Sequence, residues 1–194
     1  MTYFPGIQDD EFIRGDIPMT KQEIRILVLA KAKISPHDII VDIGAGTGSL
    51  SIEAALQAPL GKVYAIERHA EGIDLICANA AKFMAANVEA ISGSAPQALQ
   101  GLPVADVILI GGSGGHLSEI LHNSDKLLKV QGRIVITAIT IETLYEALFI
   151  MQGKPEFDVE AFGAQISRIK HLKTSNMLQA LNPIYIITCI KKSL

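Results

Sequence analysis

The segment from Ile39 to Ser49, IIVDIGAGTGS, constrains this chain more than any other. Four apolar residues and an Asp lead into three alternating glycines, and a helical pattern follows at once. A buried strand, a tight turn and a helix N-terminus in this order form a binding site for a nucleotide-like ligand. Gly44 permits the turn, Gly46 lets the backbone approach a ligand, and Gly48 lets the helix pack closely on the strand. The motif favours a cofactor-binding α/β protein, although a plain strand-to-helix turn is the alternative.

Strands and helices alternate along the first three quarters of the chain. We expect strands at residues 39–43, 62–67, 88–91, 106–110 and 133–137, and helices at 20–33, 49–56, 70–84, 117–128 and 140–151. This alternation predicts a parallel sheet with right-handed crossovers. Two further strands are expected at 157–162 and 184–190. The polar run 167–176 between them shows no apolar period, so these two strands should pair antiparallel at an edge of the sheet.

Local signals suggest where some of these elements begin and end. Residues 1–19 contain several breakers and should form an irregular leader. Thr20 and Glu23 have the spacing of a capping box, which would open the first helix. Gln131 and Gly132 should close the helix at 117–128. With 194 residues, the chain suits a single domain spanning 1–194.

Composition narrows the possible partners. The hydrophobic fraction of 49% and the mean hydropathy of +0.33 are high, which favours burial of apolar surface between subunits. The net charge of −3, with no long basic run, disfavours nucleic-acid binding. Cys77 and Cys189 lack metal-ligand spacing, so we expect reduced core thiols and no metal site. The acidic start and the lack of an apolar run of about 20 residues predict a cytoplasmic protein that does not span a membrane.

An acidic residue and a short loop indicate which cofactor the glycine turn serves. Glu67 ends the second expected strand, 23 residues after Gly44, where a carboxylate accepts hydrogen bonds from a ribose diol. NAD enzymes and S-adenosylmethionine enzymes share that contact, and a surface Glu is the alternative. Ser49 occupies the final glycine of GxGxxG, and the antiparallel ending fits a seven-stranded methyltransferase sheet. Both features favour S-adenosylmethionine. The loop at Ser94 and Ala95 would then lie beside the adenine, although a plain loop is the alternative.

Several segments together resemble one family. They are the leader segments 6–13 and 18–21, the turn 42–48, the loop GGSGG at 111–115, and residues 137–138. The chain resembles the decarboxylating cobalt-precorrin-6B C15-methyltransferases of anaerobic cobalamin biosynthesis, and is similar to the C-terminal half of the fused precorrin-6Y methylases. The resemblance covers nearly the whole chain. It implies a cytoplasmic, usually tetrameric enzyme with a Rossmann-like class I methyltransferase sheet, mostly parallel with an antiparallel C-terminal strand.

The resemblance also implies roles for particular residues. The cofactor-binding residues would be Thr20, Gly44, Ala45, Gly46, Thr47, Gly48, Glu67, Ser94 and Ala95. Thr20 would contact the methionine end of S-adenosylmethionine, and its helix-capping role is the alternative. Gly112, Ser113 and Gly114 would form a side-chain-free ledge that lets a flat tetrapyrrole approach the methyl donor, although a flexible turn is the alternative.

The expected chemistry needs little from the protein beyond positioning. An electron-rich ring carbon attacks a sulfonium methyl without a base, and a conjugated macrocycle is its own electron sink for decarboxylation. His116 and Glu142 lie near the right strand ends but suit structural roles, so no catalytic residue is assigned. The substrate bears many carboxylates, and the basic run containing Arg168, Lys170, His171 and Lys173 is the candidate to bind them. A solvated charged loop is the alternative.

Other functions remain open at this point. An RNA or protein methyltransferase would use the same fold and cofactor. An NAD-dependent oxidoreductase would share the glycine turn, and a non-catalytic cofactor-binding scaffold would share the fold without turnover.

Overall fold

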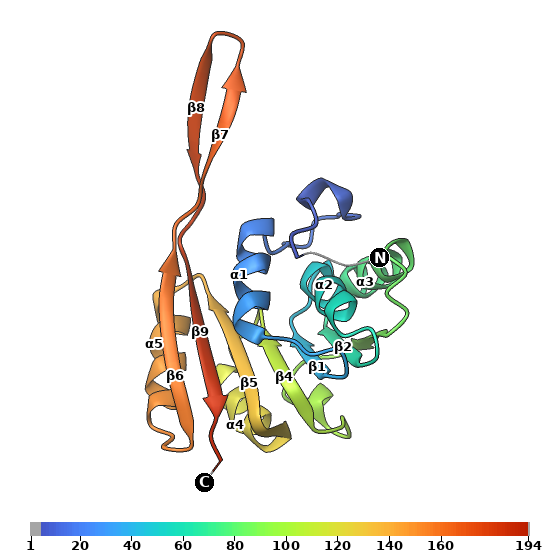
Figure 1. Cartoon of the computed structure of the whole chain (residues 1–194), viewed down its shortest axis with the longest axis vertical. Coiled ribbons are helices and arrows are strands. Elements are labelled where there is room, and N and C mark those ends of the chain that lie inside the picture. The colour runs from blue at the N-terminus through green and yellow to red at the C-terminus, as the bar shows by residue number, and fades with distance from the viewer. Residues whose placement is uncertain (1–4, 194) are drawn as a thin grey trace.

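Seven strands form one open sheet in this computed structural model, which describes residues 5–193 (Figure 1). Across the sheet the order is β3-β2-β1-β4-β5-β9-β6. The strands are β1 Ile39–Ile43, β2 Lys62–Glu67, β3 Val88–Ser92, β4 Ala105–Ile110, β5 Leu128–Ala138, β6 Phe157–Ala164 and β9 Ile184–Lys191. The first five pair in parallel, and β9 pairs antiparallel with both β5 and β6. The expected mostly parallel sheet with an antiparallel C-terminal strand is therefore confirmed.

Helices cover both faces of the sheet. They are α1 Gln22–Ala32, α2 Ser49–Gln57, α3 Ala70–Lys82, α4 Leu117–Leu127 and α5 Ile141–Gln152. Apolar side chains of α1 and α2 pack on one face, and those of α4 and α5 pack on the other. Because the central strands β1 and β4 are buried on both faces, their sequences are almost continuously apolar rather than alternating. The carboxyl ends of the parallel strands meet at one edge, where their loops converge.

Two predicted boundaries are wrong. Helix α1 begins after Lys21, whose extended backbone forms the N-cap without a side-chain hydrogen bond, so Thr20 and Glu23 make no capping box. The carbonyl of Thr20 accepts instead from Arg25 Nη1 at 2.5 Å. Residues 131–132 do not close α4, because that helix passes directly into β5, which includes them.

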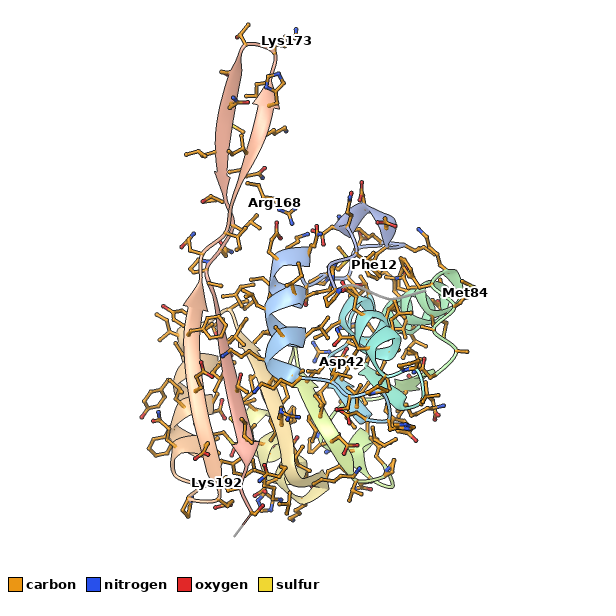
Figure 2. The ribbon with its side chains drawn as sticks, in the orientation of Figure 1. Phe12, Asp42, Met84, Arg168, Lys173 and Lys192 are labelled. Atoms are coloured by element: carbon orange, nitrogen blue, oxygen red, sulfur yellow. The ribbon has the colours of Figure 1, made fainter. Side chains whose placement is uncertain are left out.

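The predicted polar loop between the last two strands is a second, two-stranded sheet. Strands β7 (Ser167–Leu172) and β8 (Ser175–Ala180) pair antiparallel along their whole length and project from the body as an arm (Figure 1). The arm, residues 167–180, is largely exposed on both faces. Exposure on both faces removes the apolar alternation that would reveal a strand in the sequence. Lys173 lies at its far tip, and Arg168 lies at its base beside α1 (Figure 2).

The two cysteines differ in their surroundings. Burial raises the pKa of the Cys189 thiol to about 12, as expected for a core residue. Cys77 is exposed on α3, one position beyond the buried Ile76, so its prediction as a core thiol is wrong. Among residues 5–193, no helix is both long enough and apolar enough to span a bilayer.

Arg25 connects the leader to the body of the protein. Its guanidinium is fully buried, with Nε 2.7 Å from Glu53 Oε1 and Nη1 2.9 Å from Asp9 Oδ1. It also donates to the carbonyls of Thr20 and Ile7, and it lies 4.8 Å from the ring centroid of Phe12. A single side chain of α1 thereby holds the leader against α2. One 3₁₀ turn, Asp9–Glu11, interrupts an otherwise irregular leader in its described part.

Replacing Arg25 should destabilise the protein strongly. In Arg25→Met the buried ion pair between Arg25 and Glu53 is lost, and breaking such a buried pair costs about 3–5 kcal/mol. Urea denaturation followed by circular dichroism measures the free energy of unfolding. The control is Lys62→Met, which removes an exposed ion pair with Glu89 and should cost no more than about 1 kcal/mol. Equal losses in the two variants would contradict a central role for Arg25.

Candidate active site

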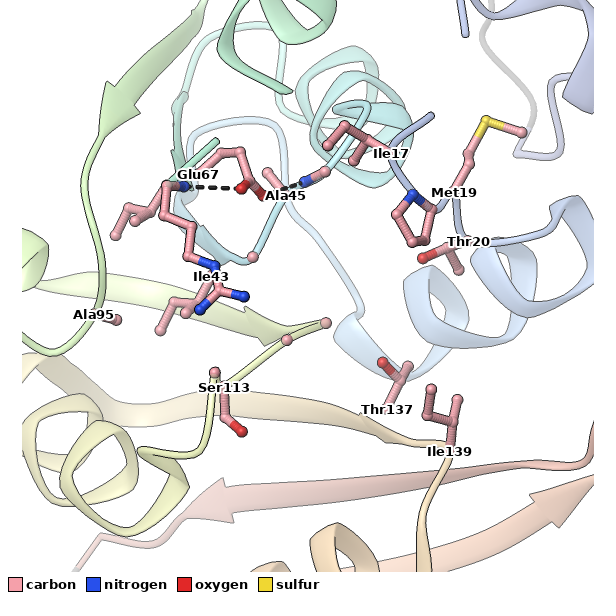
Figure 3. Close-up of a pocket in the computed structure, with 18 of the residues that line it drawn as sticks. Ile17, Met19, Thr20, Ile43, Ala45, Glu67, Ala95, Ser113, Thr137 and Ile139 are labelled. Atoms are coloured by element: carbon pink, nitrogen blue, oxygen red, sulfur yellow. Dashed lines mark hydrogen bonds between the residues drawn. The ribbon is translucent and has the colours of Figure 1, made fainter. Parts of the chain in front are cut away.

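A cavity of about 600 Å³ opens at the carboxyl ends of the central strands (Figure 3). This volume lies within the range of small-molecule sites. Of the residues predicted to contact the cofactor, it is lined by Thr20, Gly44, Ala45, Gly46, Glu67, Ser94 and Ala95. Gly112, Ser113 and Gly114 line it as well. Thr47, Gly48, Arg168 and Lys170 do not. The structure therefore gathers most of the sequence candidates around one space.

The glycine turn after β1 leaves no room for side chains at Gly44 and Gly46. At Gly44, φ is +73°, and an added Cβ would lie 2.8 Å from the backbone nitrogen and oxygen of Gly112. At Gly46, φ is +59°, and a Cβ would lie 2.9 Å from the carbonyl oxygen of Pro18. The turn is thus enclosed by two other segments. Gly48 does not face the strand as expected, because its Cβ would meet Ile76 of α3 at 3.0 Å.

Glu67 joins the end of β2 to the glycine turn. Its Oε1 accepts from the backbone nitrogens of Arg68 and His69 at 2.8 and 2.9 Å, and Oε2 accepts from Gly46 N at 2.9 Å (Figure 3). Only 6% of Glu67 is exposed. A carboxylate has about four lone-pair positions, and the three N–H donors leave acceptor capacity on Oε2. Glu67 can therefore organise the turn and still accept a hydroxyl from a ligand.

A second carboxylate lies buried in β1 before the turn. Asp42 is 1% exposed, and its Oδ2 accepts from Ser51 Oγ at 2.5 Å. Burial raises the pKa of Asp42 to about 6, since desolvation penalises the ionised form; the Ser51 bond opposes this rise and the charge of Glu67 adds to it. Ser51 belongs to α2, so this bond connects the strand and the helix that flank the turn.

The loop Gly111–Gly115, hereafter the glycine ledge, forms the wall beside the turn. The nitrogens of Gly111 and Gly112 both donate to the carbonyl of Ile43, at 2.9 and 3.3 Å. The ledge is therefore attached to the last residue of β1. Several apolar side chains and one hydroxyl line the cavity beyond it: Ile17, Ile24, Ile139, Ile166, Ile184 and Thr137. This composition suits a ligand with a broad apolar surface.

The structure also places the weaker candidates. His116 lines the cavity, but its Nδ1 lies 2.9 Å from Glu119 Oε2 and the side chain is exposed, while Glu142 does not line the cavity. Arg168 does not reach the cavity, because its guanidinium pairs with Asp9 and Glu23 at 2.9 and 2.7 Å. Lys170 is exposed on the arm. Among residues 5–193, no cluster of three metal-binding side chains is present.

Sequence reasoning missed two cations of the cavity wall, Lys21 and Arg68. Each directly follows a predicted site residue, Thr20 or Glu67. These neighbours could have been predicted from the sequence. A residue next to a ligand-binding residue at a strand end lies at the same edge of the sheet. The sequence analysis instead chose the denser basic run near Arg168 as the candidate to bind carboxylates.

The sheet order, the glycine turn after β1 and the acid ending β2 define a Rossmann-like protein with a class I methyltransferase fold. The sequence profile of the precorrin methyltransferase domain matches residues 11–191. The chain therefore belongs to the precorrin methyltransferase family.

Named relatives match the chain along nearly its whole length. A probable cobalt-precorrin-6B C(15)-methyltransferase (decarboxylating) of Sulfurisphaera tokodaii is 43% identical over 94% of this chain and 96% of its own. The enzyme of that name from Salmonella typhimurium is 36% identical over 96% of each chain. The crystal structure of precorrin-6y C5,15-methyltransferase from Geobacter metallireducens is similar with a TM-score of 0.91 at 39% identity, covering 96% of this chain and 98% of that one.

The buried Asp42 should make stability depend on pH. Because its folded pKa of about 6 exceeds the unfolded value of 3.8, folding favours the protonated acid. This contribution is fully present below about pH 4 and is lost as pH rises to about 6, by roughly 2–3 kcal/mol. In Asp42→Asn it is absent, so the variant should gain stability relative to wild type by that amount between pH 4 and 7.

Urea denaturation at pH 4, 5, 6 and 7 measures this difference. The control is Asp74→Asn, which removes an exposed acid of α3 and shows the effect of an Asp-to-Asn change away from the turn. A difference for Asp42→Asn that does not vary with pH would show that Asp42 ionises in the folded protein as easily as in the unfolded chain.

Proposed function

We propose that this protein is an S-adenosylmethionine-dependent methyltransferase that methylates C15 of cobalt-precorrin-6B and removes carbon dioxide from an acetate side chain, in cobalamin biosynthesis. The observation that supports this most directly is the match to enzymes of that name at 43% and 36% identity over nearly the full length of both chains. The leader and the glycine ledge support it further, because these family-like segments both line the cavity.

The residues of the cavity fit S-adenosylmethionine. The turn at Gly44–Gly46 presents backbone and only the Ala45 methyl group to a methionine moiety, and Glu67 keeps acceptor capacity for a ribose diol. Ser94 and Ala95 offer a small wall for adenine, and Thr20 lies across the cavity with a hydroxyl (Figure 3). When bound, this cofactor supplies an electrophilic methyl group on a cationic sulfur. We propose no direct ligand contact for Thr47 or Gly48, which shape the turn from behind the cavity wall.

The chain's own contribution to the reaction is positioning. The glycine ledge has no side chain that would hold a flat macrocycle away from the turn, except Ser113. Oriented juxtaposition of two reactants contributes on the order of 7–11 kcal/mol to rate acceleration. Apolar side chains such as Ile24, Ile139 and Ile184 line the adjoining wall. A poorly solvated carboxylate loses carbon dioxide more readily, so this wall suits the decarboxylation.

We further propose that the chain acts as one domain in a cytoplasmic homotetramer. Two exposed apolar surfaces support assembly. Ile169 and Leu178 of the arm are 70% and 74% exposed. On α5, Ile141, Tyr145 and Phe149 recur at helical spacing and are at least 66% exposed. Large apolar patches of this kind mark interfaces between protein chains.

Methyl transfer and carbon dioxide release should both occur with cobalt-precorrin-6B and methyl-labelled S-adenosylmethionine. We expect one labelled methyl on the macrocycle and one carbon dioxide per turnover. Methyl uptake without carbon dioxide would assign decarboxylation to another protein. Label in RNA or protein instead would favour the rival methyltransferases, and binding of S-adenosylhomocysteine without any turnover would indicate a scaffold. Heat of binding with NAD would support the oxidoreductase.

Glu67→Gln should weaken cofactor binding. The amide replaces an acceptor oxygen by a donor that faces backbone N–H groups, and it removes the charge that favours the ribose hydroxyls. Hydrogen bonds to charged groups are worth about 1.5–3 kcal/mol, so the Kd for S-adenosylhomocysteine should rise roughly 10–100-fold. Isothermal titration calorimetry measures this, with Asp74→Asn as the matched control. An unchanged Kd would remove Glu67 from the cofactor site.

A further inference from the structure

Two cations line the cavity without an acidic partner. Among residues 5–193, neither Arg68 nor Lys21 has a carboxylate within ion-pair distance. Two other basic side chains beside the leader are neutralised: Arg25 pairs with Glu53 and Asp9, and Arg168 pairs with Asp9 and Glu23. The net positive charge of the cavity wall therefore resides on Arg68 and Lys21.

Arg68 extends from the end of β2 toward the glycine ledge. Its backbone nitrogen is held by Glu67 Oε1, and its Nε lies 3.1 Å from Nε2 of His69. Its Nη1 lies only 3.0 Å from where a Cβ on Gly114 would stand. A side chain at position 114 would therefore collide with the guanidinium of Arg68 in this position. A glycine here leaves room for a planar, charged group beside the ledge.

Lys21 approaches the same cavity from another element. It is the N-cap of α1, and its carbonyl accepts from the nitrogens of Ile24 and Arg25 at 3.0 and 2.9 Å. Its backbone is therefore anchored next to Thr20. The partly buried side chain belongs to the cavity wall, where its charge adds to that of Arg68.

We propose that Arg68 and Lys21 are the substrate-recognition residues that bind carboxylates of the tetrapyrrole side chains. This inference rests on the proposed function, which requires a polycarboxylate to enter a protein of net charge −3. The planar guanidinium of Arg68 matches a carboxylate in two parallel hydrogen bonds, and the Lys21 ammonium supplies a point charge. Arg168 and Lys170 take no part, since one is paired with two acids and the other lies on the arm.

Methionine substitutions test these residues because they remove charge and keep a long apolar side chain. Arg68→Met and Lys21→Met should each raise the KM for cobalt-precorrin-6B about tenfold, whereas kcat and the Kd for S-adenosylhomocysteine should change less than twofold. Arg68→Lys should recover part of the affinity. Lys126→Met, an exposed cation of α4, is the matched control and should change none of these values. Unchanged KM values in both variants would overturn the inference.

A neutral substrate analogue separates charge recognition from packing. Wild type should bind the fully methyl-esterified macrocycle more weakly than the acid, and the two Met variants should bind the ester as well as wild type does. Loss of S-adenosylhomocysteine affinity in Arg68→Met would instead assign Arg68 to the adenosine site.

Direct binding of cobalt-precorrin-6B, followed by its absorbance, keeps this inference distinct from the proposed function. If wild type binds the macrocycle without turnover, the proposed enzymatic function is wrong. The affinities of the Arg68→Met and Lys21→Met variants for the macrocycle then still test the role of these two residues. If wild type does not bind it, both fail.

Discussion

The buried guanidinium of Arg25 is the interaction on which the arrangement of the cavity depends. Removing a cation from water is costly, and Arg25 offsets that cost with two carboxylates and two backbone carbonyls. Its partners come from α2 and from the leader, so folding of α1 places the leader across the carboxyl edge of the sheet. Pro18 then covers Gly46, and Met19 and Thr20 line the cavity. Without this anchor, the glycine turn would open to solvent on one side.

The sequence predicted the elements whose formation depends on residues close together in the chain. The buried strands appear as apolar runs, and the turn at Gly44 and the acid at Glu67 lie at strand ends that any parallel sheet brings together. The two strands of the arm were not predicted, because both faces of the arm are exposed and its sequence lacks apolar alternation. The acidic partners of Arg168, Glu23 and Asp9, are more than 140 residues away in sequence. No pattern near residue 168 predicts these ion pairs. The predicted capping role of Thr20 is wrong because helix α1 begins one residue later, with Lys21 as its N-cap.

Charges of opposite sign occupy different parts of the site. Asp42 is buried in β1 before the glycine turn, and Glu67 lines the cavity beside the turn, where its charge helps to raise the pKa of Asp42. Arg68 and Lys21 lie on the wall. For the proposed reaction this separation is useful, because the methyl donor is a cationic sulfonium and the acceptor is a polycarboxylate. Each reactant then meets the complementary field, and the two are drawn toward one another across the ledge.

The features that select a substrate lie outside the elements that define the fold. A glycine turn and an acid after β2 suit many methyltransferases, so they specify the cofactor rather than the acceptor. In the proposed function, the acceptor side is built from the leader, the glycine ledge and Arg68 after β2. The leader is held by Arg25, and the ledge is held by the carbonyl of Ile43 through Gly111 and Gly112. Changes in either segment can alter acceptor recognition without disturbing the strands, because neither contributes a strand to the sheet.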